Sequence, residues 1–190
     1  MKIKNREVKI LVQLRKAKLT DAQELYNITQ DKEVMKYYGM GPYDTLSEAE
    51  DEIKWFLSLL DEEQGVRWII ADSTNDKYIG DVGIFNYNPD QNRIEIGFKL
   101  KRDYWNKRIM SSCIKQVLDF GFNVMKVNRI EALIDKRNPA CQNTLKKCGF
   151  SYEGLLREYE LENEEYVDLE MHSILFREYP TKVTGTCEIM

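Results

Sequence analysis

The chain has 190 residues, 43% of them hydrophobic, and a formal net charge of −4. This length fits one domain with a real core, which we place at residues 1–180, followed by a tail at residues 181–190. The acidic balance argues against a nucleic-acid partner, because a phosphate backbone is bound by a basic surface. No run approaches the roughly 18 apolar residues of a membrane span, and the N-terminus lacks the apolar core of a signal peptide. We therefore expect a soluble cytoplasmic protein.

The composition gives little support to metal or disulfide chemistry. The chain has one histidine and four cysteines, and no two cysteines form a C-x-x-C pair. We expect the cysteines to be reduced thiols and expect no transition-metal site. The cysteines are Cys113, Cys141, Cys148 and Cys187.

Apolar alternation and capping-box spacings in the N-terminal half predict two helices among several strands. Alternating apolar residues from Val8 to Leu14 predict a first strand. The spacings Thr20–Gln23 and Ser47–Glu50 match capping boxes, which predict helices through about residue 29 and residue 60. The aromatic and glycine-containing segment between them, residues 31–44, indicates a structured loop. Polar turns then separate three strands, which predicts an antiparallel meander. These strands are predicted at residues 67–71, 78–85 and 93–100.

Residues 93–122 predict a strand that leads into a helix. Apolar residues alternate from Ile94 to Leu100, and the apolar period changes to that of a helix from Met110 to Gly121. The link from Lys101 to Arg108 is basic. Free N–H groups, a helix dipole and cations would meet there, which suits a phosphate, although an ordinary solvated turn would have the same features.

The C-terminal half predicts one more helix and three more strands. Asn138-Pro139 is a strong helix start, and Gly149 is a suitable stop. The strands are predicted at residues 128–135, 150–159 and 166–176. A strand–helix–strand unit makes the strands 93–100 and 128–135 parallel neighbours. The expected fold is a single α/β domain with a mixed central sheet of about seven strands flanked by helices.

Two segments carry a resemblance to a known family. Residues 104–111, reading YWNKRIMS, resemble the acetyl-CoA pyrophosphate loop of the GCN5-related N-acetyltransferases (GNAT superfamily), in the RimJ/RimL-like branch. Residues 138–150 resemble the second signature of that family, N-x-x-S followed by a short helix and Gly-Phe. Asn106 and Arg108 stand where the family has two glycines, and Cys141 stands where it has serine.

The resemblance implies acetyl-CoA as co-substrate and a V-shaped opening between the strands 93–100 and 128–135. Backbone N–H groups near Phe98, Lys99 and Leu100 would face the thioester carbonyl. Asn138 would hydrogen-bond the pantetheine arm. The pyrophosphate would lie on the loop and the helix start. The implied residues there are Trp105, Asn106, Lys107, Arg108, Ile109, Met110 and Ser111; of these, Trp105 is more typical of packing.

The resemblance also implies catalytic residues. Attack on a thioester requires a neutral amine, so a carboxylate is the expected base. Glu160 matches the base of the RimL-like enzymes, although it also fits a solvated acidic turn, and Glu95 is the second candidate. Cys141 would assist the departing thiolate as a weak donor, or would simply be a small residue at a helix start.

The sequence thus predicts an N-acetyltransferase that transfers acetyl to a primary amine. We expect a protein N-terminus of the ribosomal-protein type as the acceptor. The alternatives are a small amine, such as a polyamine or an aminoglycoside, and a non-catalytic relative that binds an acyl-CoA. The sequence leaves open whether the protein forms a homodimer.

Overall fold

The computed structural model describes residues 11–162 and 164–180. The strands are β1 (Val12–Lys16), β2 (Val66–Asp72), β3 (Tyr78–Asn88), β4 (Arg93–Leu100), β5 (Arg129–Asp135), β6 (Ser151–Glu162) and β7 (Glu165–Leu175). The α-helices are α1 (Ala22–Thr29), α2 (Lys32–Met35), α3 (Leu46–Asp61), α4 (Ile109–Asp119) and α5 (Pro139–Lys147). Single turns of other helix types are η1 (Leu19–Asp21), η2 (Arg102–Tyr104), η3 (Phe120–Val124) and η4 (Phe176–Glu178).

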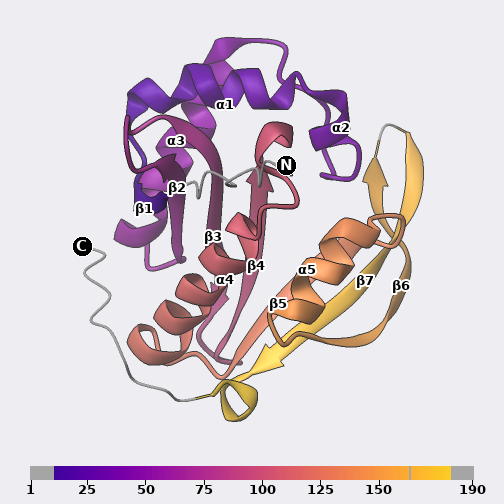
Figure 1. Ribbon diagram of the computed structural model, residues 1–190. Helices are drawn as coiled ribbons and strands as arrows, with labels where there is room; N and C mark the ends of the chain where they lie inside the picture. Colours follow the sequence, from indigo (N-terminus) through magenta and orange to yellow (C-terminus); the bar gives the residue numbers. More distant parts are fainter. Residues whose placement is uncertain (1–10, 163, 181–190) are drawn as a thin grey trace, which may run out of the picture.

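One mixed sheet of seven strands, in the order β1-β2-β3-β4-β5-β7-β6, runs through the molecule (Figure 1). The strands β1 to β4 pair antiparallel in sequence order, as the meander predicted. The strands β4 and β5 are the parallel pair. The hairpin of β6 and β7 completes the sheet, with β7 antiparallel to β5. The predicted fold class is confirmed.

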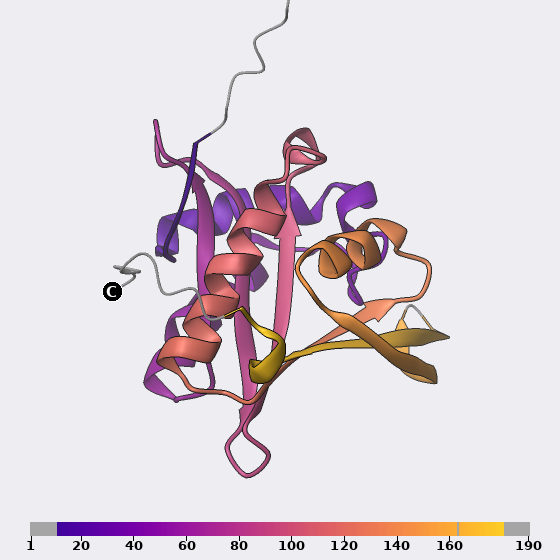
Figure 2. The same ribbon diagram turned by 60° about the horizontal axis from the view of Figure 1, so that its bottom comes forward.

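Helices cover both faces of the sheet (Figure 2), with α4 on one face and α1 and α3 on the other. Successive residues of β2 point to opposite faces of the sheet, so this strand contributes to the apolar core on each face. Trp68 and Ile70 belong to the apolar cluster that includes α4, whereas Ile69 and Ala71 belong to the cluster under α1 and α3. Two cores on opposite faces therefore fix the orientation of β2.

Both predicted capping boxes are wrong. The first helical turn begins after Lys18, whose N–H donates to the Asp21 carboxylate at 2.8 Å. The second long helix begins after Thr45, and the Thr45 hydroxyl donates to Glu48 at 3.0 Å. The sequence offers overlapping S/T-x-x-E spacings here, and the spacing alone does not select between them.

Other boundaries differ by a few residues. The first strand starts at Val12, and the earlier residues of its prediction, Val8 and Ile10, lie outside the described residues, as does the predicted tail. The 31–44 segment contains the short helix α2. The helix predicted through residue 122 ends at Asp119 and continues as one π-helical turn.

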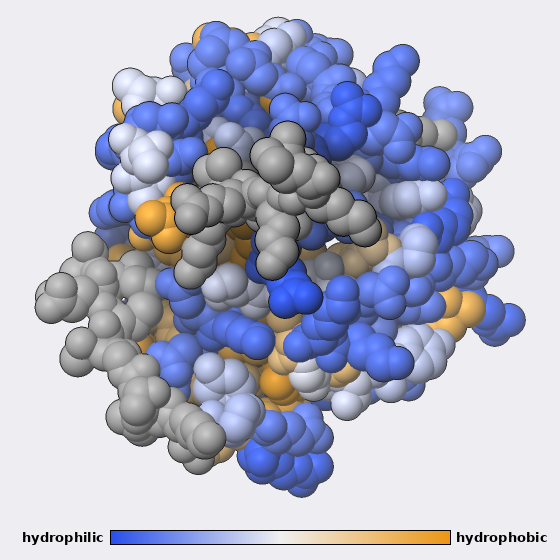
Figure 3. All heavy atoms as spheres, in the orientation of Figure 1, coloured by the Kyte–Doolittle hydropathy of each residue, from blue (hydrophilic) through white to orange (hydrophobic). Residues whose placement is uncertain are grey.

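The surface drawn in Figure 3 is mostly hydrophilic, with apolar residues gathered near its middle. Among the helices of residues 11–162 and 164–180, none is both long and apolar enough to cross a membrane.

Candidate functional site

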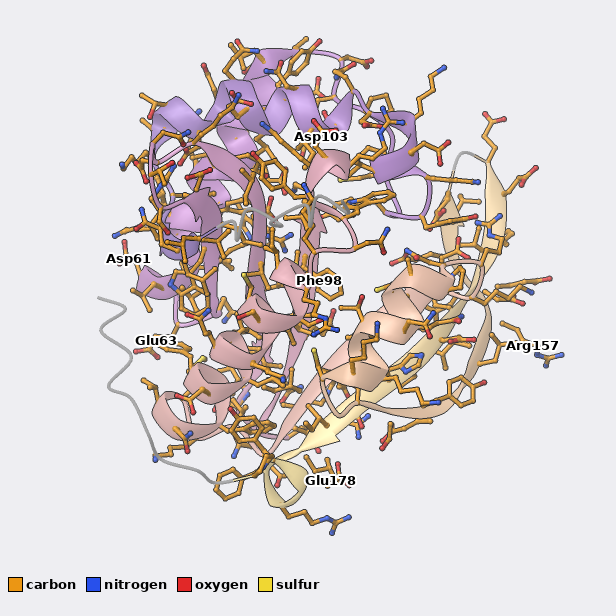
Figure 4. All side chains as sticks on the ribbon, in the orientation of Figure 1. Asp61, Glu63, Phe98, Asp103, Arg157 and Glu178 are labelled. Carbon is orange, nitrogen blue, oxygen red and sulfur yellow. The ribbon has the colours of Figure 1, made fainter. Side chains whose placement is uncertain are left out.

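The strands β4 and β5 separate after a short paired stretch (Figure 1). Three register pairs join them, the last being Glu95 with Glu131. From Gly97 to Leu100, β4 pairs with β3 alone. Phe98, labelled in Figure 4, lies on this diverging part. Because strand N–H groups point alternately to the two sides, some of those in this stretch face the β5 side without a strand partner. They can bind an extended ligand as an added strand would.

The loop before α4 keeps the backbone of a glycine loop without the glycines. Asn106 and Arg108 both have φ of +60°, in the left-handed region. These are the two positions where the resemblance expects glycine. Asn tolerates this region, but a β-carbon on arginine makes it unfavourable. The loop therefore follows the expected path at a cost in strain.

The start of α4 is open to an anion. No side chain caps it, and the N–H groups of the first helical turn have no partner within the helix. The Arg108 side chain is exposed and forms no ion pair with any residue of the described chain. Lys107 is exposed beside it. Free N–H groups and a helix dipole thus lie beside two exposed cationic residues, a combination that suits a pyrophosphate. The Lys107 Nζ lies over the Tyr104 ring, 5.5 Å from its centroid.

Two predicted residues of this region have other contacts. The Trp105 indole N–H donates to the Leu100 carbonyl at 2.7 Å, which ties the loop to the end of β4 and supports packing. The Lys99 side chain is 1% exposed and pairs with Glu52 and Asp81 at 2.9 and 3.3 Å. Only the backbone of Lys99 can therefore face a ligand between β4 and β5.

The start of α5 lies across the opening from β4. The Asn138 side-chain oxygen accepts the Cys141 N–H at 3.0 Å, which leaves the Asn138 amide N–H groups free to donate. Cys141 is half-buried, and burial raises the pKa of its thiol to about 12. A thiol that stays neutral is a poor nucleophile, but it can still donate a weak hydrogen bond.

Acidic side chains approach the opening from two elements. Glu95 of β4 is half-buried, and burial raises the pKa of its carboxyl above the ordinary value. The nearby charges of Glu131 and Glu160 raise it further. Glu160 of β6 is exposed, and its carboxylate lies 3.4 Å from where a Cβ on Gly39 would be. The structure thus brings the two candidate bases to one space, bounded by β4, β6 and the loop after α2.

A shallow pocket of about 430 Å³ adjoins Glu95. Its lining is mostly polar and comes from the β3–β4 hairpin and from Gln64, which lies after the end of α3. The polar lining residues include Gln64, Asn86, Asn88, Asp90, Glu95 and the cationic Arg93, whose charge is paired with Glu131. Carbonyl and carboxylate oxygens of this kind suit a polar or cationic ligand.

Sequence reasoning missed a buried ionic network beside the site. Asp81 pairs with Arg67 at 2.6 Å and with Lys99 at 3.3 Å, and all three side chains are at most 3% exposed. The hydroxyl of Tyr38, from the loop after α2, accepts from Arg67 at 2.9 Å and from Lys99 at 3.3 Å. The available signal was a charged residue inside each of three predicted strands.

No group of three or more histidine, cysteine or acidic residues in the described ranges is placed to bind a metal ion.

Comparison with known proteins decides the family. The sequence model of the acetyltransferase (GNAT) domain matches residues 12–151. The chain belongs to this family. A Bacillus licheniformis protein named uncharacterized N-acetyltransferase p20 is 36% identical over 166 residues, covering 87% of this chain and 93% of that protein.

Two further relatives have names that state an acceptor. The Escherichia coli K12 spermidine N(1)-acetyltransferase is 25% identical over 145 residues, covering 76% of this chain and 75% of that protein. A Vibrio cholerae spermidine N-acetyltransferase, solved with CoA and spermine, has a TM-score of 0.77 at 23% identity. That comparison covers 88% of this chain and 97% of the other.

The acetyltransferase thus uses acetyl-CoA as its co-substrate and transfers the acetyl group to an amine. Its geometry provides the parts that this reaction needs. Backbone donors without a strand partner lie along β4, the uncapped start of α4 suits an anion, and Glu95 of β4 carries a carboxyl with a raised pKa.

Proposed function

We propose that this acetyltransferase acetylates a primary amine of a small, multiply charged cation of the polyamine class. The observation that carries the proposal is the half-buried Glu95, which lines the polar pocket and is close enough to Glu160 for that charge to raise its pKa. Several carboxylates around one space attract a polycation. A carboxylate that binds a second ammonium group of the polycation also holds the reacting amine in place.

The relatives support this acceptor class. Two proteins similar to this chain are named spermidine acetyltransferases. The protein N-terminus expected from the RimJ/RimL resemblance has less support, because both of these relatives are named for a polyamine acceptor. The small-amine alternative is therefore the better-supported choice.

We assign the role of general base to Glu95 rather than to Glu160. A base works best when its pKa lies near the working pH, and burial moves the Glu95 carboxyl in that direction. Glu160 is exposed on β6, so it is better placed to attract the cation than to remove its proton. The pyrophosphate would lie on the backbone N–H groups from Lys107 to Ser111, and the thioester carbonyl near Phe98.

Release of CoA thiol with a panel of acceptors tests the proposal. The panel contains spermidine, an aminoglycoside and peptides with free N-termini, each at equal concentration. We expect the polyamine to have a kcat/KM at least tenfold above that of any peptide. Faster turnover of a peptide would instead identify a protein N-terminus as the acceptor. Acetyl-CoA binding without any thiol release would favour a non-catalytic relative.

A further inference from the structure

Arg67 of β2 is a buried cation that is held on two of its three nitrogens. Its side chain is 3% exposed. Nε and Nη2 donate to the same Asp81 oxygen at 2.8 and 2.6 Å, and Nη2 also donates to the Tyr38 hydroxyl at 2.9 Å. The rings of Phe56 and Phe85 lie 5.1 and 5.6 Å from its guanidinium carbon. Hydrogen bonds and aromatic contacts together fix the plane of the guanidinium.

The third nitrogen, Nη1, has no hydrogen-bond partner among the described residues. Among the described residues, no fully buried side-chain nitrogen or oxygen lacks a partner, so Nη1 keeps a small area accessible to solvent although the side chain as a whole is 3% exposed. A guanidinium that is fixed on one edge and has an unpaired nitrogen on the other is a directed donor for an oxygen.

Nη1 lies over Gly97 of β4. A Cβ at Gly97 would be 3.1 Å from Nη1 and 2.9 Å from the Phe85 ring, so the missing side chain lets the guanidinium approach the strand. Gly97 is two residues past the last pair of β4 with β5, and it shares a strand face with Glu95. Nη1 thus lies over the part of β4 that no longer pairs with β5, on the strand face that Glu95 shares.

We propose that Arg67 donates from Nη1 to the carbonyl oxygen of the acetyl thioester and stabilises the negative charge that develops on it. In this step the amine nitrogen bonds to the carbonyl carbon, the C=O electron pair moves to the oxygen, and the amine proton passes to Glu95 or to water. The C=O then re-forms, the C–S bond breaks and the CoA thiolate leaves. A fixed cationic donor acts most strongly on the intermediate, because the oxygen is most negative there.

The test observes the carbonyl directly. A ketone analogue of acetyl-CoA, in which a methylene replaces the thioester sulfur, is labelled with ¹³C at the carbonyl and bound to the full-length protein without acceptor. We expect the ¹³C resonance to move downfield on binding to the wild type, because a cationic hydrogen bond polarises the carbonyl. Arg67→Lys should lose most of this shift.

A second variant leaves the ionic network intact. Gly97→Ala keeps Arg67 and Asp81 but places a methyl group against Nη1 and Phe85, and Gly97 does not have a positive φ that alanine would strain. We expect it to lose the carbonyl shift and to lower kcat by about 10², the usual effect of one oxyanion donor. The dissociation constant of acetyl-CoA should change less than threefold. Gly154→Ala, where a Cβ meets nothing within 4 Å, is the matched control and should change neither readout.

A Gly97→Ala protein that is folded by circular dichroism and keeps the downfield shift would overturn the proposal. A fall in kcat with an unchanged carbonyl resonance would overturn it equally, because Arg67 would then act on the acceptor or on the fold. If Arg67→Lys fails to fold, Gly97→Ala decides alone.

Discussion

At the scale of single residues, Glu95 combines a functional and a destabilising role. Its carboxyl is half-buried with a raised pKa, so the folded protein binds this proton more readily than the unfolded chain. The stability linked to Glu95 is therefore full below the ordinary glutamate pKa and is lost as pH rises through the raised value. At neutral pH a charged Glu95 thus lowers stability while it provides the base.

Glu95→Gln should accordingly lower kcat by at least about 10² and raise the melting temperature at pH 7, since it removes both the base and a desolvated charge. Thiol release across pH 6 to 9 and thermal unfolding measure the two effects. The acidic limb of the pH–rate profile should disappear in the variant. Glu160→Gln is the matched control and should affect kcat less. A larger loss in Glu160→Gln would make Glu160 the base, as the resemblance first implied.

Cys141 offers a separate test at the start of α5. Because burial keeps its thiol neutral, it can only donate weakly, and a hydroxyl is the better donor in the same space. We expect Cys141→Ser to preserve or modestly raise kcat and Cys141→Ala to lower it. Steady-state rates of the three proteins decide, and equal rates would leave Cys141 a packing role only.

At the scale of elements, strand and helix periods predicted most of the fold. Alternation identified β4, and the later helical period identified α4, because each element buries one face. The start of α3 was missed because two S/T-x-x-E spacings overlap there, and the first helical turn was missed because its N-cap, Lys18, is not a residue that the capping pattern includes. Residues 104–111 were predicted by resemblance to bind the acetyl-CoA pyrophosphate. The left-handed backbone of this loop at non-glycine residues was visible only in the structure.

The strain in that loop gives a prediction for the start of α4. Arg108→Gly should raise the free energy of unfolding by about 1 kcal/mol, since glycine adopts a left-handed φ without penalty. The dissociation constant of acetyl-CoA should change less than tenfold, because the backbone cradle is already in place. Chemical denaturation and calorimetry measure the two quantities.

Lys126 supplies the control for this prediction, since it has the same φ of 60° but precedes β5. Lys126→Gly should give a similar gain in stability with no change in acetyl-CoA affinity. If Arg108→Gly tightened acetyl-CoA binding much more than tenfold, the Arg108 side chain would be obstructing the pyrophosphate, and the expectation that the native loop already binds acetyl-CoA would fail.

At the scale of the whole molecule, one ionic network joins the loop after α2 to three strands and α3. Asp81 and Lys99 are register partners on β3 and β4, and Arg67 reaches Asp81 from β2. Glu52 of α3 accepts from Lys99 at 2.9 Å and is also hydrogen-bonded by Tyr43. Such a network follows from strand register, which single-sequence patterns do not give, so the sequence did not predict it.

Removing the central carboxylate should therefore affect the whole fold. Burial disfavours the Asp81 charge, but Lys99 and Arg67 outweigh burial and lower the pKa of Asp81. Asp81→Asn leaves two buried cations undercompensated and should lower the free energy of unfolding by about 3–5 kcal/mol.

The loss should be greatest near neutral pH and shrink as pH falls through the lowered pKa of Asp81. Urea denaturation at several pH values measures it. Asp51→Asn, which breaks an exposed pair with Lys54, should leave the midpoint nearly unchanged. A small effect of Asp81→Asn would mean that the network does not stabilise the fold.

The central claim is that an acidic site draws a multiply charged amine to Glu95. The most direct test is kcat/KM for a series of linear amines with one, two and three positive charges and the same reacting primary amine. We predict that kcat/KM rises with each added charge and that this rise shrinks at high salt, because salt screens the attraction. Equal values across the series at low salt would contradict the account.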